Sequence, residues 1–323
     1  MKKWLLGFLS LIVFSFFSYA QTYPSRPINL IVAYPAGGAT DIVARALAEV
    51  MSKDLGQPII VDNKPGASGI LGTTSLVNSA PDGYTMMLGI TQSVLINKFL
   101  YKNLPYDPTK QLTLISQLAQ GPILVLVPNE SPIKSASDLY RYASDGSHVT
   151  TCGSWGAGSS GHMACSFMAK SWNAPITHVA YKGEAPMMQD LAGDHLTYAL
   201  GSILVAKPLI EAKKVRVIAV LGDRSKNPLL SSIPSFEDAG FKDPEYKVAG
   251  WFCIVGPRNL PKEIAQRWEL ATLKALRLPE IQKRFDALAL DITGTNSEQF
   301  KLNYFQELPV WEKMVKLSGA TLD

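Results

Sequence analysis

The sequence has 323 residues and a mass of 35.2 kDa, a length typical of two domains that each bury a core. Hydrophobic residues make up 47% and charged residues 18%, which indicates a globular protein and excludes a disordered or fibrous chain. The formal charge of +4 arises from 31 Lys and Arg against 27 Asp and Glu without a long basic run, so a nucleic-acid-binding protein is not expected.

The N-terminus has the pattern of a secretory signal peptide. Lys2 and Lys3 form a short positive region, and the largely apolar stretch that follows, residues 4–19, is 16 residues long. A helix needs about 20 residues to cross a bilayer, so an uncleaved membrane anchor is the weaker alternative. We predict that residues 1–20 are removed after Ala20 and that the mature chain is exported as a soluble protein, in a bacterium to the periplasm.

The rest of the sequence alternates short apolar runs with amphipathic stretches. Its first half predicts, in chain order, a strand at 27–33, a helix at 41–55, a strand at 58–62, a helix at 68–79, strands at 84–89 and 123–127, and a helix at 135–143. Its second half predicts a strand at 148–152, a helix at 160–172, a strand at 176–179, a helix at 185–192, strands at 196–200, 215–221 and 250–255, and helices at 261–275, 279–287 and 297–317. This order indicates an α/β protein with mostly parallel sheets flanked by helices.

Two glycine-rich turns lead from a predicted strand into a predicted helix, at residues 34–41 (YPAGGATD) and 153–161 (GSWGAGSSG). Glycine lets a ligand approach the backbone, and the free N–H groups at a helix start bind anions. One helix N-terminus contributes about 0.3–2 kcal/mol, whereas micromolar binding needs about 8 kcal/mol. We therefore expect two domains that close over a small carboxylate and apply both turns to it. For the first turn, a well-capped βα turn without a ligand is the alternative.

Two enzymatic interpretations remain open as alternatives. Gly156, Gly158 and Gly161 form a G-x-G-x-x-G pattern, and Glu184 lies where a ribose-binding acid would be expected, but export argues against a nucleotide cofactor. Ser154 and His162 permit an exported hydrolase, although no G-x-S-x-G motif is present. Metal-binding motifs are also absent, so we expect no catalysis, no cofactor and no metal.

The three cysteines lack a C-x-x-C spacing. Cys152 and Cys165 flank the second glycine-rich turn, and Cys253 is left over. In an oxidising compartment the first two are candidates for a disulfide, and buried free thiols are the alternative.

Six short motifs occur in order along the chain, and they carry a family resemblance. They are residues 34–41 (YPAGGATD), 63–67 (NKPGA), 80–84 (APDGY), 104–108 (LPYDP), 158–162 (GSSGH) and 181–183 (YKG). Together they resemble the Bug family of periplasmic solute-binding proteins, receptors of tripartite tricarboxylate transporters, over nearly the whole mature chain. The resemblance implies a type II Venus-flytrap fold, with domain 1 at residues 21–123 plus 250–323, domain 2 at 124–249, and a hinge near 121–128 and 248–252.

The resemblance also implies a ligand and its site. The expected ligand is a small mono- or dicarboxylic or aromatic acid, held by backbone N–H groups and water. The implied site residues are Tyr34, Ala36, Gly37, Gly38, Ala39, Thr40, Asp41, Thr91, Ser93, Ser154, Trp155, Gly158, Ser159, Ser160, His162, Tyr181, Lys182, Gly201 and Ser202. We expect a monomer whose partner is a membrane permease or, in the alternative, a sensor kinase of a two-component system.

Some positions depart from the family pattern. Tyr34 stands where Phe is common, and Val94 where His is frequent. Gly201 and Ser202 replace an Asp-Asn pair, so a carboxylate partner for a ligand ammonium group is missing. We therefore expect amino-acid ligands to be disfavoured relative to plain carboxylates, and the extra space to admit an aromatic acid. Trp251 and Phe252 are expected to pack in the hinge rather than to contact the ligand.

Overall fold

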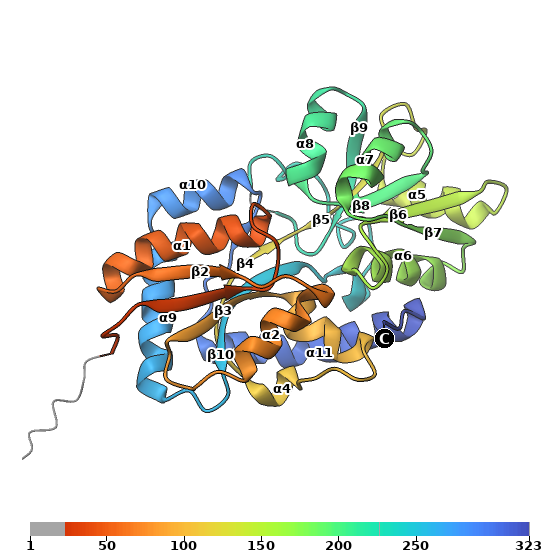
Figure 1. Cartoon of the computed structure of the whole chain (residues 1–323). Helices are drawn as coiled ribbons and strands as arrows, with labels where there is room; N and C mark the ends of the chain where they lie inside the picture. The colour runs from red at the N-terminus through yellow and green to blue at the C-terminus, as the bar shows by residue number, and fades with distance from the viewer. Residues whose placement is uncertain (1–22, 226, 323) are drawn as a thin grey trace, which may run out of the picture.

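The computed structural model describes residues 23–225 and 227–322, so the predicted signal peptide lies outside the described residues. Two β-sheets, one of six and one of five strands, lie beside each other and are each flanked by helices (Figure 1). The predicted two-domain α/β architecture is confirmed, whereas the exact domain boundaries stay a prediction. None of the described helices is both long and apolar enough to cross a membrane.

The first sheet has the strand order β11-β4-β10-β3-β1-β2. Its strands are β1 (Ile28–Val32), β2 (Ile59–Asn63), β3 (Thr85–Ile90), β4 (Leu112–Gly121), β10 (Gly250–Pro257) and β11 (Asp291–Ile292). Strand β1 pairs in parallel with β2 and β3, while β10 is antiparallel to β3 and β4, and β11 is antiparallel to β4. The sheet is therefore mixed.

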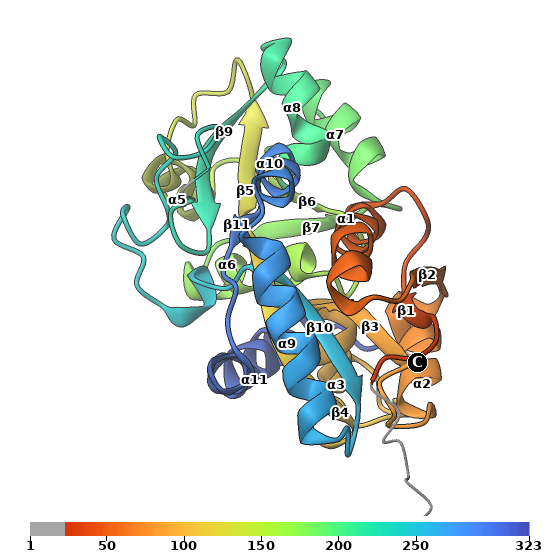
Figure 2. The same ribbon diagram turned by 90° about the vertical axis from the view of Figure 1, so that its left-hand side faces the viewer.

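Helices bury both faces of this sheet. They are α1 (Ala39–Leu55), α2 (Ile70–Val77), α3 (Asn97–Leu100), α4 (Pro108–Gln111), α9 (Lys262–Leu276), α10 (Pro279–Ala287) and α11 (Ser297–Ser318), with shorter helical turns η1 (Ala67–Gly69) and η2 (Gln92–Ile96). Along β1, Ile28 and Leu30 face the core under α1 and α9, and Ile31 faces the opposite core. Figure 2 shows α1, α9 and α10 on the near side of this unit. Burial on both faces explains why β1 is apolar throughout.

The second sheet has the order β7-β6-β8-β5-β9. Its strands are β5 (Ile123–Pro128), β6 (Thr150–Ser154), β7 (Ile176–Ala180), β8 (Tyr198–Gly201) and β9 (Val215–Leu221). Strand β6 is parallel to β7 and β8, and β5 is antiparallel to β8 and β9. Its helices are α5 (Ala136–Asp145), α6 (Ser160–Ser171), α7 (Glu184–Ala192) and α8 (Ile203–Glu211).

The expectation of mostly parallel sheets is wrong in this detail, and the segments that cross between the units explain it. The chain leaves the first sheet along β4 and enters the second along β5, with Pro122 between them, and it returns into β10 through residues 222–249, which include η3 (Pro244–Tyr246). Strands β5 and β10 both run antiparallel to their neighbours. Helix α11 packs against β4 and also against α6, so it touches both units.

Candidate functional site

A cavity of about 600 Å³ lies between the two units, within the range of small-molecule sites. The polar residues of the first unit that line this cavity are Tyr34, Thr40, Ser68, Thr91 and Gln92. The second unit contributes residues 155–160 together with Glu184, Gly201 and Ser202. An apolar wall is formed by Ile203, Leu204, Val205, Leu230, Leu288 and Leu290. Among the described residues that line the cavity there is no Lys, Arg or His.

The first loop, residues 34–38, ends where α1 begins. The first helical hydrogen bond runs from Ile42 N to Gly38 O, so the N–H groups of Ala39 and Thr40 have no partner within the helix. Both residues line the cavity, as does Tyr34. The helix start therefore presents unpaired donors toward the cavity.

Asp41 holds this loop rather than facing the cavity. Its buried carboxylate accepts hydrogen bonds from Arg45 Nε at 2.9 Å, Gly37 N at 2.9 Å and Asn63 Nδ2 at 3.0 Å. The hydrogen bond from Arg45 is the main reason why the pKa of Asp41 falls to about 2. Because Gly37 N–H is used in this way, it is not free for a ligand. The predicted residues Ala36, Gly37, Gly38 and Asp41 lie outside the cavity lining.

The turn after β3 joins the cavity to the crossing strand β10. Thr91 lines the cavity, and its Oγ1 accepts a hydrogen bond from Trp251 N at 2.8 Å. Ser93, also predicted for the site, is fully buried behind the lining, where its carbonyl accepts a hydrogen bond from Tyr106 Oη. Trp251 and Phe252 both border the cavity, and the Trp251 indole donates to Glu307 Oε2 at 2.9 Å.

The second loop, residues 155–159, leads into α6. Ser159 caps this helix, because its Oγ accepts a hydrogen bond from His162 N at 3.1 Å. Gly158 N donates to His162 Nδ1 at 3.1 Å, so His162 positions the loop and lies outside the cavity lining. Trp155, Gly158, Ser159 and Ser160 line the cavity. Gly161 accommodates the Trp155 ring, since a Cβ there would lie 2.7 Å from it, and this packing explains the last glycine of the G-x-G-x-x-G pattern.

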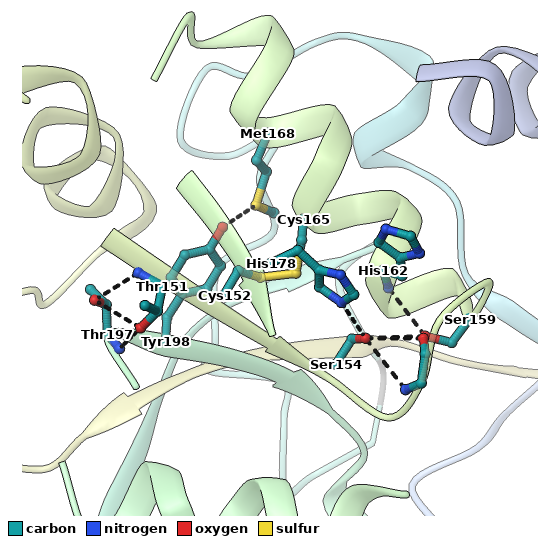
Figure 3. Close-up of a disulfide and its surroundings, with 11 residues drawn as sticks. Thr151, Cys152, Ser154, Ser159, His162, Cys165, Met168, His178, Thr197 and Tyr198 are labelled. Carbon is teal, nitrogen blue, oxygen red and sulfur yellow. Dashed lines mark hydrogen bonds between the residues drawn. A yellow bond between two sulfur atoms is a disulfide. The ribbon is translucent and has the colours of Figure 1, made fainter. Parts of the chain in front are cut away.

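Behind the second loop, Ser154 is fully buried and shares a hydrogen bond with His178 Nε2 at 2.7 Å (Figure 3). The His178 ring stacks on His162 with 3.9 Å between centroids. Burial lowers the pKa of His162 and, together with the charge of His162, lowers that of His178 to about 4. The Ser154 hydroxyl does not reach the cavity, and among the described residues no carboxylate hydrogen-bonds to His178. This arrangement supports the loop and does not fit a hydrolase nucleophile.

A disulfide joins the two elements that flank the second loop. Cys152 on β6 is bonded to Cys165 on α6, with 5.9 Å between their Cα atoms (Figure 3). Cys253 is free and buried. The covalent link fixes the distance between the end of β6 and the first turns of α6. Within the described part of the chain, no group of three His, Cys, Asp or Glu residues is arranged to hold a metal ion.

Residues 43–319 match the model of the tripartite tricarboxylate transporter family receptor. The chain belongs to this family. It is 32% identical over 281 residues to the UPF0065 protein in the gbd 5′ region of Cupriavidus necator, covering 87% of this chain and 84% of that relative. The structure of R. palustris Rpa4515 with adipate is similar at a TM-score of 0.78 and 30% identity, over 93% of this chain and 100% of that one. The structure of periplasmic binding protein BugD is similar at a TM-score of 0.74 and 28% identity, over 93% of this chain and 99% of BugD. The resemblance to the Bug proteins is thereby confirmed.

In this tripartite tricarboxylate transporter receptor, the wall next to the second loop differs from the sequence prediction. Tyr181 Oη donates to Asp190 Oδ2 at 2.7 Å, and both Tyr181 and Lys182 lie outside the cavity lining. Glu184, which begins α7, lines the cavity and accepts hydrogen bonds from Ser202 N at 3.1 Å and Ser202 Oγ at 2.6 Å. A carboxylate is thus present beside Gly201 and Ser202. The replacement of the Asp-Asn pair by Gly201 and Ser202 therefore does not leave this wall without a carboxylate.

From the sequence, Glu184 had a predicted role only in the alternative nucleotide site. The local signal was present, because Glu184 begins a helix directly after Gly183, in the same strand-turn-helix pattern as the two loops. Its partner Ser202 precedes α8, a helix that the sequence pattern did not predict. Without α8, nothing indicated that the two residues meet.

Proposed function

We propose that this receptor captures a small carboxylate between its two domains, in the periplasm, and presents it to a membrane permease of a tripartite tricarboxylate transporter. The observation that carries the proposal is the pair of helix starts, α1 and α6, that border one cavity whose described lining holds no basic side chain. Unpaired backbone N–H groups at helix N-termini favour an anion without a cationic residue. The periplasmic binding protein BugD, with a similar fold, supports the location.

The two helix starts act together in this proposal. The N–H groups of Ala39 and Thr40 serve one side. The N–H group of Ser160, which precedes the first bond of α6 from Met163 N to Ser159 O, serves the other. Each helix start supplies about 0.3–2 kcal/mol, so domain closure, which adds hydrogen bonds and excludes water, is needed for micromolar affinity. The ligand first docks on one loop, and closure applies the second. The receptor acts as a monomer without catalysis.

The apolar wall gives the expected shape of the ligand. Leu204, Leu230 and Leu290 border the cavity, so a carboxylate with an aliphatic or aromatic body buries apolar surface there. The structure of the similar Rpa4515 with adipate supports an aliphatic acid of moderate length. We therefore propose mono- and dicarboxylic acids and aromatic acids as the ligands to screen.

The proposal is tested by placing a negative charge at the start of α1. Ala39→Asp puts a carboxylate next to the proposed anion site, where an acidic residue is compatible with the helix dipole and so with folding. We expect isothermal titration calorimetry with a panel of small acids to give a Kd at least tenfold weaker for Ala39→Asp than for the parent. The size-matched control Ala39→Asn is expected to stay within about threefold.

A second test measures how much a bound acid stabilises the folded protein. An acid present at 100 times its Kd stabilises the parent by about 2.7 kcal/mol and is recovered unchanged after incubation. Equal affinity of Ala39→Asp and Ala39→Asn for every acid that the parent binds would refute the proposed role of the first loop. Turnover of the acid that disappears in Ser154→Ala would instead support an exported hydrolase.

A further inference from the structure

Among the described residues that line the cavity, Glu184 alone carries a carboxyl group, and no basic side chain lies beside it in the lining. The cavity is bordered by no Lys, Arg or His among the described residues. No ion pair joins Glu184 to any basic side chain of residues 23–225 and 227–322, and the neighbouring Lys182 is exposed and outside the lining. Glu184 is therefore an acidic side chain without a basic partner among the described residues of a site otherwise made of neutral groups.

The fold holds this carboxylate in a fixed place. Ser202 donates to Glu184 Oε2 through both its backbone N–H and its hydroxyl. Ser202 immediately precedes α8 and Glu184 begins α7, so two helix N-termini face the carboxylate. Both features favour its ionised form. Burial is the larger influence, and it raises the pKa of Glu184 above its usual value.

One oxygen of this carboxylate is left for a ligand. Both bonds from Ser202 end on Oε2, and no described residue donates a hydrogen bond to Oε1. An ionised carboxylate only accepts hydrogen bonds, so the ligand group beside it must be a donor. A second ligand carboxylate would meet a like charge at short range in a partly desolvated site, whereas an ammonium group would complete the pair.

We propose that Glu184 sets the ligand preference of this receptor within the class of small carboxylates, by pairing with an ammonium group of a zwitterionic acid that carries a single carboxylate and by disfavouring dicarboxylates. The inference rests on the proposed function, since the ligand carboxylate is the group held by the two loops. It reverses the expectation, drawn from Gly201 and Ser202, that amino-acid ligands are disfavoured. The chemistry of the wall is set by a residue 17 positions before that pair.

Matched acids of one skeleton test this proposal at pH 8, which favours the ionised form of the Glu184 carboxyl group. Adipate, 6-aminohexanoate and hexanoate differ at one end only, as do terephthalate, 4-(aminomethyl)benzoate and 4-methylbenzoate. In calorimetric titrations of the mature chain, we expect the ammonium-bearing acid of at least one series to bind tenfold or more tighter than its dicarboxylate. Glu184→Gln should lower that ratio at least tenfold and change the Kd of the methyl-terminated acid less than threefold.

Two further variants keep the test decisive. Ser202→Ala removes one donor to Glu184 but keeps the charge, so the preference for the ammonium-bearing acid should persist. Glu184→Ala replaces Glu184→Gln if the latter melts at a lower temperature than the parent. An unchanged ratio in the variants lacking the charge, or a parent that prefers the dicarboxylates, would overturn the assignment of Glu184. Failure of all six acids to bind any of these proteins would instead overturn the proposed function, and this inference with it.

Discussion

Reduction of the disulfide between Cys152 and Cys165 should destabilise the protein by an amount that follows from the number of residues between the two cysteines. The two cysteines are 13 residues apart, and they close a loop that contains the whole second loop. In the chain-entropy description, a link over that separation removes about 3 kcal/mol of conformational freedom from the unfolded chain. For a protein of this size, that corresponds to a fall in Tm of roughly 6 °C.

Urea unfolding followed by circular dichroism, with and without dithiothreitol, measures this difference. The variant Cys152→Ala/Cys165→Ala is the control, because the reductant should leave its free energy of unfolding unchanged. Cys253→Ala, which removes the free buried thiol, should respond to the reductant as the parent does. The reasoning fails if thiol titration shows full reduction of the parent while its free energy of unfolding changes by less than about 0.5 kcal/mol.

Two other predictions concern groups that hold the loops. Asp41→Asn should lower the free energy of unfolding, measured in urea at pH 7, by about 2 kcal/mol, because it weakens charge-assisted bonds to Arg45 and Gly37. The pKa of Asp41 is about 2 against a usual 3.8, so the parent should lose this contribution only as the pH falls from about 4 to about 2. A variant as stable as the parent would contradict this role of Asp41. His178 has a pKa of about 4 against a usual 6.5, so as the pH falls the unfolded chain takes up a proton at this residue before the folded protein does. The contribution of His178 to the free energy of unfolding should therefore be complete above pH 6.5 and fall by on the order of 2 kcal/mol toward pH 4. His178→Gln should flatten that part of the pH profile, and a variant with the parental slope would show that other groups cause it.

Local features were predictable from the sequence, and features that depend on distant partners were not. The two glycine-rich turns are local, and their helix starts do border one cavity. Which side chains face that cavity depends on remote residues. Ser154 turns away toward His178, and Tyr181 toward Asp190, in each case through a hydrogen bond that the spacing did not indicate.

Strand β4 was missed for the same kind of reason. Its sequence carries Ser116 and Gln117, which are polar but buried and so obscure the apolar pattern of a strand. Their partner is Thr295, far along the chain: Ser116 Oγ donates to its carbonyl at 2.7 Å, and Gln117 N donates to its Oγ1 at 3.1 Å. Helix α8 was missed because Pro208 lies inside it, which counts against a helix in any local pattern.

The position of Trp155 gives this receptor a built-in optical reporter. Its indole borders the cavity and packs over Gly161, at the start of the helix proposed to contact the anion. The other described tryptophans, Trp172, Trp251, Trp268 and Trp311, are at most 7% exposed. A solute that enters the cavity should alter the fluorescence emission of Trp155, so occupancy can be followed without an attached dye. The variant Trp155→Phe measures any response of Trp251, which also borders the cavity.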